Sequence, residues 1–250
     1  MGLYFLSVGA GLRASEIVYD RAGSSFAATG PEDYDFDRLL EGARLLHLSG
    51  ITPALGPRSA EAARAAARAA KRLGVPVSFD GNYRAMLWEA WDSDPRAILS
   101  DLIDHADILF GNHRDLSLLL GRDFSGEGED RRREAAEAGF AAFPALKLIA
   151  STARHTITAD HHRIAARVDL RETSHQTPEV DVTGIVDRIG AGDAFAAGVL
   201  HAHLAGGEAR AMAETGLALT ALKHSLPGDA SRFGQVDIEA FHAGGLDVRR

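Results

Sequence analysis

The stretch that most constrains the fold of this chain is a glycine turn between an extended segment and a helical one. An apolar run over residues 182–186 leads into DRIGAGDAF at 187–195, and a helical pattern follows over 191–204, ending at Gly206-Gly207. A strand, a glycine turn and a helix N-terminus together make an anion site. Free backbone N–H groups point outward there, and the helix dipole favours negative charge.

The residues of this turn indicate a particular chemistry. Gly190 and Gly192 carry no side chains, so an oxyanion can come close to the backbone. Asp193 lies in the first helical turn, where its carboxylate could take a proton from an alcohol. An anion hole beside a carboxylate base is what phosphoryl transfer to a hydroxyl needs. The alternative is an ordinary strand–helix turn in which Asp193 only caps the helix.

The composition excludes several classes of protein. The chain has 250 residues, of which 46% are hydrophobic, so it can bury a core in one or two domains. A formal net charge of -8 argues against a nucleic-acid or membrane-surface partner, and an anionic substrate would need local arginines. The chain has no cysteine, which excludes disulfides and thiolate metal sites and fits a cytoplasmic enzyme. No apolar run approaches the roughly 20 residues of a membrane span.

The order of the expected elements predicts an α/β fold. The pattern favours helices at 58–73, 95–105, 115–120, 131–143, 191–205, 208–224 and 236–243, and strands at 75–79, 107–110 and 146–150. Such alternation is typical of a parallel sheet with helices on both faces. Tyr4–Val8 and Glu16–Arg21 instead form a predicted hairpin around Gly9-Ala10-Gly11. We therefore expect a small β appendage over 1–30 and an α/β core over 31–250.

The pattern D-x-x-G-A-G-D-x-F at 187–195 closely resembles the C-terminal signature of the ribokinase-like (PfkB) carbohydrate kinases. The resemblance implies a ribokinase-like, three-layer core with a parallel sheet, covered by a small β lid. It implies ATP-dependent phosphorylation of a sugar hydroxyl, with ATP and Mg²⁺ as cofactors. Asp193 would be the catalytic base, and the amides around Gly190, Ala191 and Gly192 would hold the transferring phosphate.

Two further stretches resemble one subgroup of this family. Residues 46–52 (LHLSGIT) and 80–88 (DGNYRAMLW) are similar to the 2-keto-3-deoxygluconate kinases, which implies a sugar acid as substrate. The substrate-binding residues implied by the resemblance are Tyr4, Tyr19, Arg21, Ile51, Arg84 and Asp229. Two arginines suit the carboxylate of such a substrate. The alternative is that Arg84 pairs on the surface with Asp80 or Glu89 and that the tyrosines only pack the hairpin.

The resemblance also implies nucleotide-binding residues. The family usually has Asn-x-x-Glu where this chain has Asn112 and, in place of the Glu, Asp115, which could organise a water-bound Mg²⁺ near the phosphates. The alternative is that this pair only caps a helix. Ser151 and Arg154 follow the strand at 146–150, where many relatives have a glycine-bearing loop beside ATP.

Two basic pairs elsewhere are expected to have no role in catalysis. His161-His162 lie in a predicted hairpin, and we expect both on the surface. Lys223-His224 end a helix, where positive charge is favourable by itself.

The resemblance covers the chain as the later part of a family member. The family has a further N-terminal segment with a sheet strand, more lid strands, and a glycine pair plus an Asn that bind sugar. We therefore expect an N-terminally truncated kinase whose exposed strand edges favour a homo-oligomer. Two other functions remain open: a kinase for fructose or a deoxyketose, or a catalytically silent remnant that binds nucleotide or a protein.

Overall fold

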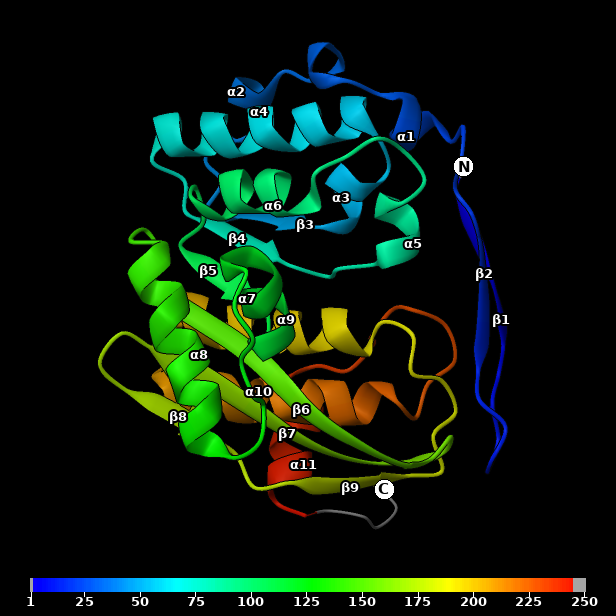
Figure 1. Cartoon of the computed structure of the whole chain (residues 1–250). Coiled ribbons are helices and arrows are strands. Elements are labelled where there is room, and N and C mark those ends of the chain that lie inside the picture. The colour runs from blue at the N-terminus through cyan, green and yellow to red at the C-terminus, as the bar shows by residue number, and fades with distance from the viewer. Residues whose placement is uncertain (1, 245–250) are drawn as a thin grey trace. The chain divides into compact units, whose positions relative to one another are not determined.

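A computed structural model describes residues 2–244, and contacts within the chain divide it into two compact units (Figure 1). The first unit contains residues 2–5, 17–150 and 169–172. The second contains residues 6–16, 151–168 and 173–244. The main passage from the first unit to the second occurs inside one strand, β6 (Leu148–Thr158).

The first unit is built on a parallel sheet. β3 (Leu46–Ser49), β4 (Val77–Asp80), β5 (Ile108–Phe110) and the first three residues of β6 pair in that order. Parallel neighbours require crossover connections, which are usually helical. The crossovers contain α3 (Ile51–Ala54) and α4 (Pro57–Leu73), then α5 (Ala85–Trp88) and α6 (Pro95–Ile103), then α7 (His113–Leu120) and α8 (Glu129–Ala142). The carboxyl ends of β3, β4 and β5 therefore share one edge of the sheet.

The sequence explains where α4 begins, packs and ends. Pro57 occupies the first helical position, where its missing N–H costs nothing. The helix buries eight small residues, five of which, including Ala67 and Ala70, belong to the core that contains Phe79 and Leu102. Gly74 ends the helix with a left-handed φ of 71°, and its N–H donates to Ala70 O. The predicted helix at 58–73 is confirmed.

The N-terminal residues form the predicted hairpin. β1 (Leu3–Ser7) and β2 (Glu16–Asp20) pair as a separate two-stranded sheet (Figure 1). Three short helical turns then lead to β3: α1 (Ser25–Ala28), the 3₁₀ turn η1 (Pro31–Asp33) and α2 (Phe36–Leu39). All three contact α4, so this connecting segment is part of the first unit.

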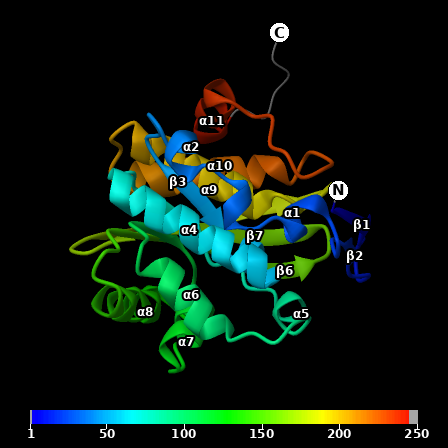
Figure 2. The same ribbon diagram turned by 90° about the horizontal axis from the view of Figure 1, so that it is seen from above.

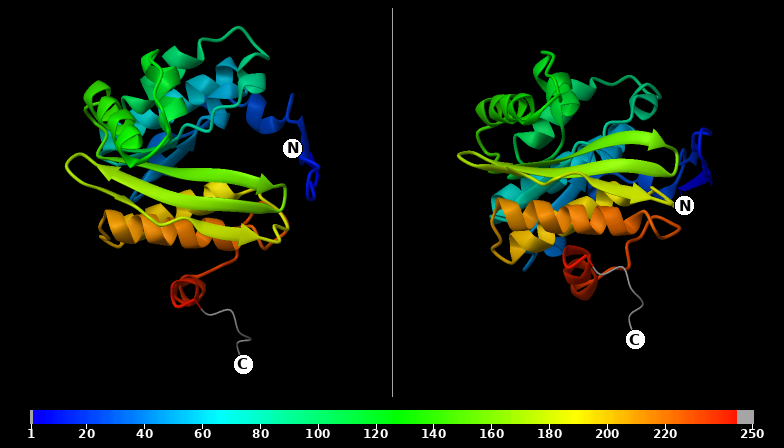
Figure 3. Two further views of the ribbon diagram at one scale, coloured as in Figure 1. Left: turned by 60° about the horizontal axis from the view of Figure 1, so that its bottom comes forward. Right: turned by 90° about the horizontal axis from the view of Figure 1, so that it is seen from below.

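The second unit places a mixed set of strands beside a helix pair. β6 pairs with β7 (His161–Leu170), which also carries β8 (Ser174–Gln176) and, antiparallel, β9 (Val180–Thr183). Figure 3 shows β6, β7 and β9 as a twisted layer beside the helix pair. α9 (Ala191–Leu204) and α10 (Ala209–Lys223) lie side by side (Figure 2), and α11 (Gln235–His242) packs on α10.

Two glycines let α9 and α10 approach closely. A Cβ atom on Gly198 would lie 2.7 Å from the carbonyl oxygen of Thr215. A Cβ on Gly216 would lie 2.8 Å from the side chains of Phe195 and Val199. Because no real Cβ is tolerated at such distances, the backbones themselves form the contact. The middle of α9 is thus packed directly on α10.

The structure corrects the expected loop after residue 150. β6 runs on from Leu148 to Thr158, so Ser151 and Arg154 lie on a strand rather than in a loop. The continuation is rich in Thr, Arg and His and lacks an apolar run, which is why sequence periodicity missed it. Threonine nevertheless suits a strand, because its branched Cβ fits the pleated surface.

The structure also corrects the expected exposure of the two adjacent histidines. His161 is partly exposed and its Nε2 lies 2.7 Å from Asp181 Oδ1. His162 is wholly buried, and its ring packs edge-on against His224 with centroids 6.1 Å apart. Successive strand residues face opposite sides, so only one of the pair could be on the surface.

The burial of His162 predicts a pH-dependent stability. Neither ring nitrogen has a hydrogen-bond partner among residues 2–244. Burial, aided by the charges of Arg154 and His224, lowers its pKa to about 4. The unfolded chain binds this proton near pH 6.5, so stability is lost as pH falls from about 6.5 to 4, by roughly 3 kcal/mol at most.

The substitution His162→Phe tests this expectation by urea unfolding at pH 7.0, 5.5 and 4.5. The variant should lose less stability on acidification than the parent chain. His201→Phe, at an exposed position on α9, is the matched control and should follow the parent. An equal acid loss in the parent and in His162→Phe would contradict this origin of the pH dependence.

Candidate active site

The predicted glycine turn forms the N-terminus of α9 in the second unit. Gly190 is the N-cap, with a left-handed φ of 76°, and it has no side chain that could accept from the first amides of the helix. A Cβ at Gly190 would lie 1.8 Å from the carbonyl oxygen of Asp229. Only glycine fits there, both for its backbone angle and for the close approach. The turn thereby brings two predicted site residues, Gly190 and Asp229, into contact.

Asp187 ties this turn to the loop that carries Asp229. Its Oδ1 accepts from the backbone N–H of Ile189 at 2.9 Å, and its Oδ2 accepts from Gly228 N at 3.0 Å. The carboxylate is buried, so these two bonds satisfy it where water does not reach. Sequence analysis gave Asp187 no role of its own, because its partner Gly228 lies 41 residues away.

The end of α10 supports the turn from behind. Thr220 Oγ1 donates to Ala191 O at 2.8 Å, and His224 O accepts from the backbone N–H of Val186 at 2.9 Å. Lys223, expected only to end a helix, is wholly buried and donates from Nζ to Leu226 O at 3.0 Å. Burial lowers the pKa of Lys223, against the opposing effect of the Asp187 and Asp229 charges. The contacts from α10 hold the backbone on both sides of the turn, at Val186 and at Ala191.

Gly190 and Gly192 differ in how close their neighbours are. A Cβ on Gly192 would meet no atom within 4 Å among the described residues. Asp193, three residues beyond Gly190 in the first turn of α9, is exposed. The fold thus needs glycine at position 190 but does not need it at 192. Open space before a helix N-terminus, next to a carboxylate, can admit an anionic group from outside the chain.

Two arginines add positive charge in the same unit. Burial and the charge of Arg188 lower the pKa of Arg154. Arg154 and Arg188 both help to lower the pKa of His224, after burial. The Arg188 charge therefore acts on the Arg154 guanidinium, and both charges act on His224. Ser151, three residues from Arg154 along β6, faces the other side of the strand by alternation, so the strand does not bring these two predicted residues together.

In the first unit the carboxyl ends of the parallel strands meet at very short backbone distances. Gly50 N donates to Asp80 O at 2.7 Å, and a Cβ on Gly50 would lie 2.0 Å from Gly81 O. Ser49 Oγ accepts from Asn82 Nδ2 at 3.3 Å. Ligands of open α/β sheets bind at this edge. The predicted residues Ile51 and Arg84 follow β3 and β4 at this edge.

The loop after β4 contains an unusual backbone conformation. Asn82 has a φ of 38°, and no other non-glycine residue within 2–244 has a positive φ. Asparagine tolerates this region because its short polar side chain can hydrogen-bond locally. Arg84 follows two residues later, and its Nη1 donates to Tyr83 O at 2.9 Å. No local pattern in the sequence points to this conformation of Asn82.

Asn112 and Asp115 form a capping box at the start of α7. Asp115 Oδ2 accepts from Asn112 N at 2.8 Å, and Asn112 Oδ1 accepts from Arg114 N at 2.8 Å. Burial raises the pKa of Asp115, and the Arg84 charge acts against this rise. A Cβ on Gly81 would lie 3.2 Å from Asp115 Oδ1. The capping alternative is therefore observed, and a role toward Mg²⁺ stays a prediction.

The donor set bears on what kind of metal could bind. No group of three or more His, Asp or Glu side chains suited to a metal occurs in the described part of the chain. One carboxylate fits a Mg²⁺ ion that arrives with nucleotide phosphates and keeps its waters, rather than an ion caged by protein.

The hairpin residues predicted to contact substrate lie on β1, β2 and just beyond. The Arg21 guanidinium carbon stands 4.7 Å from the centre of the Tyr19 ring, a cation–π contact. Tyr4 is half-buried on β1. The roles of these residues stay predictions.

Residues 1–232 match the model of the pfkB family carbohydrate kinases. The chain belongs to this family. The fold agrees: a 2-dehydro-3-deoxygluconokinase from Thermotoga maritima is 34% identical, with a TM-score of 0.90 over 98% of this chain and 74% of that one. The ribokinase-like α/β prediction is confirmed.

Two relatives of this pfkB chain are named for acid sugars. A 2-dehydro-3-deoxygalactonokinase from Haloferax volcanii is 28% identical over 98% of this chain and 71% of its own length. A 2-dehydro-3-deoxygluconokinase from Thermoproteus tenax is 31% identical over 86% of this chain. The chain spans 59% of the length of that second protein.

No helix within residues 2–244 has the length and apolar character needed to cross a bilayer.

The contrast between the two glycines gives a stability prediction for this pfkB turn. Gly190→Ala forces a left-handed Ala and a clash with Asp229, so we expect a loss above about 2 kcal/mol. Gly192→Ala meets open space in the first turn of a helix and should gain up to about 1 kcal/mol. Denaturant unfolding of both variants checks this. Equal destabilisation by the two changes would contradict the geometry.

Proposed function

We propose that this chain transfers the γ-phosphoryl group of ATP to a hydroxyl of 2-keto-3-deoxygluconate, giving the 6-phosphate. The observation that carries the proposal is the turn at 190–193. This turn contains the N-terminus of α9 with its amides. Next come Gly192, which the fold itself does not need, and the exposed carboxylate of Asp193. The names of two acid-sugar kinases among the relatives support the substrate class.

Asp193 would act as the general base. Its carboxylate accepts the proton of the sugar hydroxyl as the oxygen attacks phosphorus, which makes that oxygen a better nucleophile. Because Asp193 is exposed on the first turn of α9, its side chain can contact a bound substrate without any change in the helix.

The amides around Gly190, Ala191 and Gly192 would stabilise the charge on the transferring group. Amides at a helix N-terminus are already oriented, so little reorganisation accompanies the reaction. In this turn Ala191 N also donates to Arg188 O at 3.3 Å. Arg154 and Arg188 supply nearby positive charge for a polyanion. Mg²⁺, when bound with ATP, neutralises phosphate oxygens. An E. coli protein of this fold, 18% identical with a TM-score of 0.76, has been solved with ATP and Mg²⁺.

The sugar acid would be held by side chains of the hairpin and of the sheet edge. Arg21 and Arg84 would bind the carboxylate, because guanidinium groups pair with carboxylates in two parallel hydrogen bonds. The remaining substrate residues of the proposal are Tyr4, Tyr19, Ile51 and Asp229. Asn112, Ser151 and Arg154 would contact the nucleotide, and Asp115 would reach Mg²⁺ through water.

A second candidate is a kinase of the same family for a neutral sugar. Arg84 is exposed, and the hydrogen bond observed for it goes to the backbone of its neighbour Tyr83. This contact does not require that the substrate carry a carboxylate. Such an enzyme would keep the 190–193 turn but would not need two carboxylate-binding arginines.

Substitution of the base should separate chemistry from binding. Asp193→Asn keeps the size of the side chain and removes the proton acceptor. We expect kcat to fall about 10²–10⁴-fold, while ATP binding measured by calorimetry stays near that of the parent. A variant that kept most of the parent kcat would show that Asp193 is not the base.

The two arginines should determine the preference for an acid sugar. Arg21→Ala and Arg84→Ala should each raise KM for 2-keto-3-deoxygluconate about tenfold or more, since charge-assisted hydrogen bonds are worth roughly 1.5–3 kcal/mol. The ATP KM should stay constant. Arg210→Ala, an exposed arginine on α10 paired with Glu214, is the matched control. Equal losses toward fructose and the acid sugar would favour the neutral-sugar kinase.

A further inference from the structure

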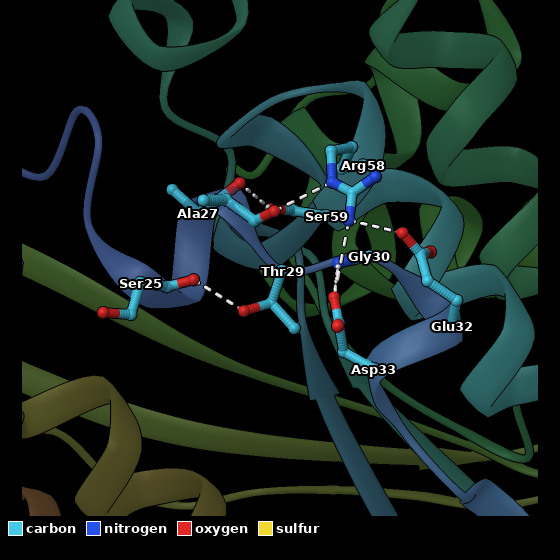
Figure 4. Close-up of polar contacts among 9 residues, drawn as sticks. Ser25, Ala27, Thr29, Gly30, Glu32, Asp33, Arg58 and Ser59 are labelled. Carbon is cyan, nitrogen blue, oxygen red and sulfur yellow. Dashed lines mark hydrogen bonds and ion pairs between the residues drawn. The ribbon is translucent and has the colours of Figure 1, made fainter.

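The four residues of α1 cannot form a stable helix without tertiary contacts, because helix nucleation is costly. Its last carbonyl groups also need donors from elsewhere. The first turn of α4 supplies both, as Figure 4 shows. Arg58 Nε donates to Ala28 O at 2.8 Å, and Ser59 Oγ donates to Ala27 O at 3.2 Å. These two side chains fix the end of α1 on α4.

The same guanidinium also holds the next turn, η1. Arg58 Nη2 lies 2.5 Å from Glu32 Oε1 and 3.4 Å from Asp33 Oδ2 (Figure 4). A Cβ on Gly30 would lie 2.8 Å from Arg58 Nη2, so a side chain there would block this approach. Arg58 therefore binds a carbonyl and two carboxylates that lie on opposite sides of Gly30. A rigid five-donor fork suits this geometry, and a lysine ammonium cannot reproduce it.

Hydrogen bonds continue from α1 back to Arg21, the residue that follows β2. The Ser24 side chain accepts from Ala27 N at 3.2 Å and caps α1, while Ser24 N donates to Arg21 O at 3.2 Å. Ser24 is itself buried. Arg21 in turn stacks on Tyr19. An unbroken series of contacts thus joins Arg58 on α4 to the root of the hairpin.

We propose that Arg58 is a positioning residue, which fixes the segment 24–33 on α4 and thereby holds Arg21 and Tyr19 where the sugar acid binds. The inference rests on the proposed function for its second half, because the role of Arg21 toward the carboxylate belongs there. Its first half, the anchoring of 24–33, stands on the contacts alone. Arg58 touches neither substrate nor nucleotide in this account.

The competing explanation is one more surface ion pair. The Arg58 and Glu32 side chains are 53% and 58% exposed, and pairs of that kind contribute little to stability. Arg72 pairs with Asp37 further along the same helix with similar exposure, but no carbonyl bond of Arg72 to α1 accompanies it among the described residues. Arg72→Ala is therefore a matched control that removes an ion pair without touching the anchor.

The experiment compares the parent, Arg58→Ala, Arg58→Lys and Arg72→Ala. Hydrogen exchange followed by mass spectrometry reports the protection of peptides covering 22–33. Steady-state kinetics with 2-keto-3-deoxygluconate and ATP report KM and kcat. We expect Arg58→Ala to lose protection over 22–33 and to raise the sugar KM about tenfold with kcat nearly unchanged, because uniform substrate binding is lost. Arg58→Lys should fall between, and Arg72→Ala should match the parent.

The outcomes are distinguishable. Unchanged protection in Arg58→Ala would overturn the anchor. Lost protection with an unchanged sugar KM would overturn the positioning role. If the parent chain phosphorylates no acid sugar while Arg58→Ala loses protection and Arg72→Ala does not, the proposed substrate fails and the anchor stands.

Discussion

The contact on which the candidate site most depends is the approach of the Gly190 backbone to the carbonyl of Asp229. No side chain can stand between them, since a Cβ would lie 1.8 Å from that oxygen. Asp187 reinforces the contact by accepting N–H groups on both sides, from Ile189 and Gly228. As a result the helix N-terminus is rigid before any ligand arrives. Preorganised donors of this kind stabilise developing charge most effectively.

The first unit uses the same device at the end of its parallel strands. Gly50 lies against Gly81 O, and Asp115 packs against Gly81 while it caps α7. Short loops that touch backbone to backbone leave little freedom for the side chains that follow them. Asn82, held by Ser49 in a strained conformation, is one consequence. Strain of this kind persists only where neighbouring contacts determine the backbone.

Local patterns in the sequence predicted what depends on local physics. The start of α9 follows from its glycines, and the extent of α4 from its alanines, Pro57 and Gly74. The hairpin follows from two extended runs around a glycine turn. The continuation of β6 beyond residue 150 was missed because the polar residues there gave no apolar period. The burial of His162 depends on packing against His224, 62 residues away, which no local pattern reveals.

The candidate site divides in the same way. The 190–193 turn was visible in the sequence, but the supports that hold it were not, because Asp187 reaches Gly228 and Thr220 reaches Ala191 across long separations. The same holds for the anchor of Arg58 on Glu32, 26 residues apart. Resemblance to the pfkB family suggested roles for single residues. The contacts in the fold explain why several of these residues have a fixed position.

The central claim is that Gly192 is kept free of a side chain for the transferring phosphoryl group and not for the fold. Single-turnover phosphoryl transfer from ATP to 2-keto-3-deoxygluconate, at saturating concentrations of both, tests it most directly. Gly192→Ala should slow the transfer by about 10²-fold, because a shift of about 1 Å in the reacting group is enough for such a loss. A Gly192→Ala protein that is as stable as the parent and transfers phosphate at the parent rate would contradict the account.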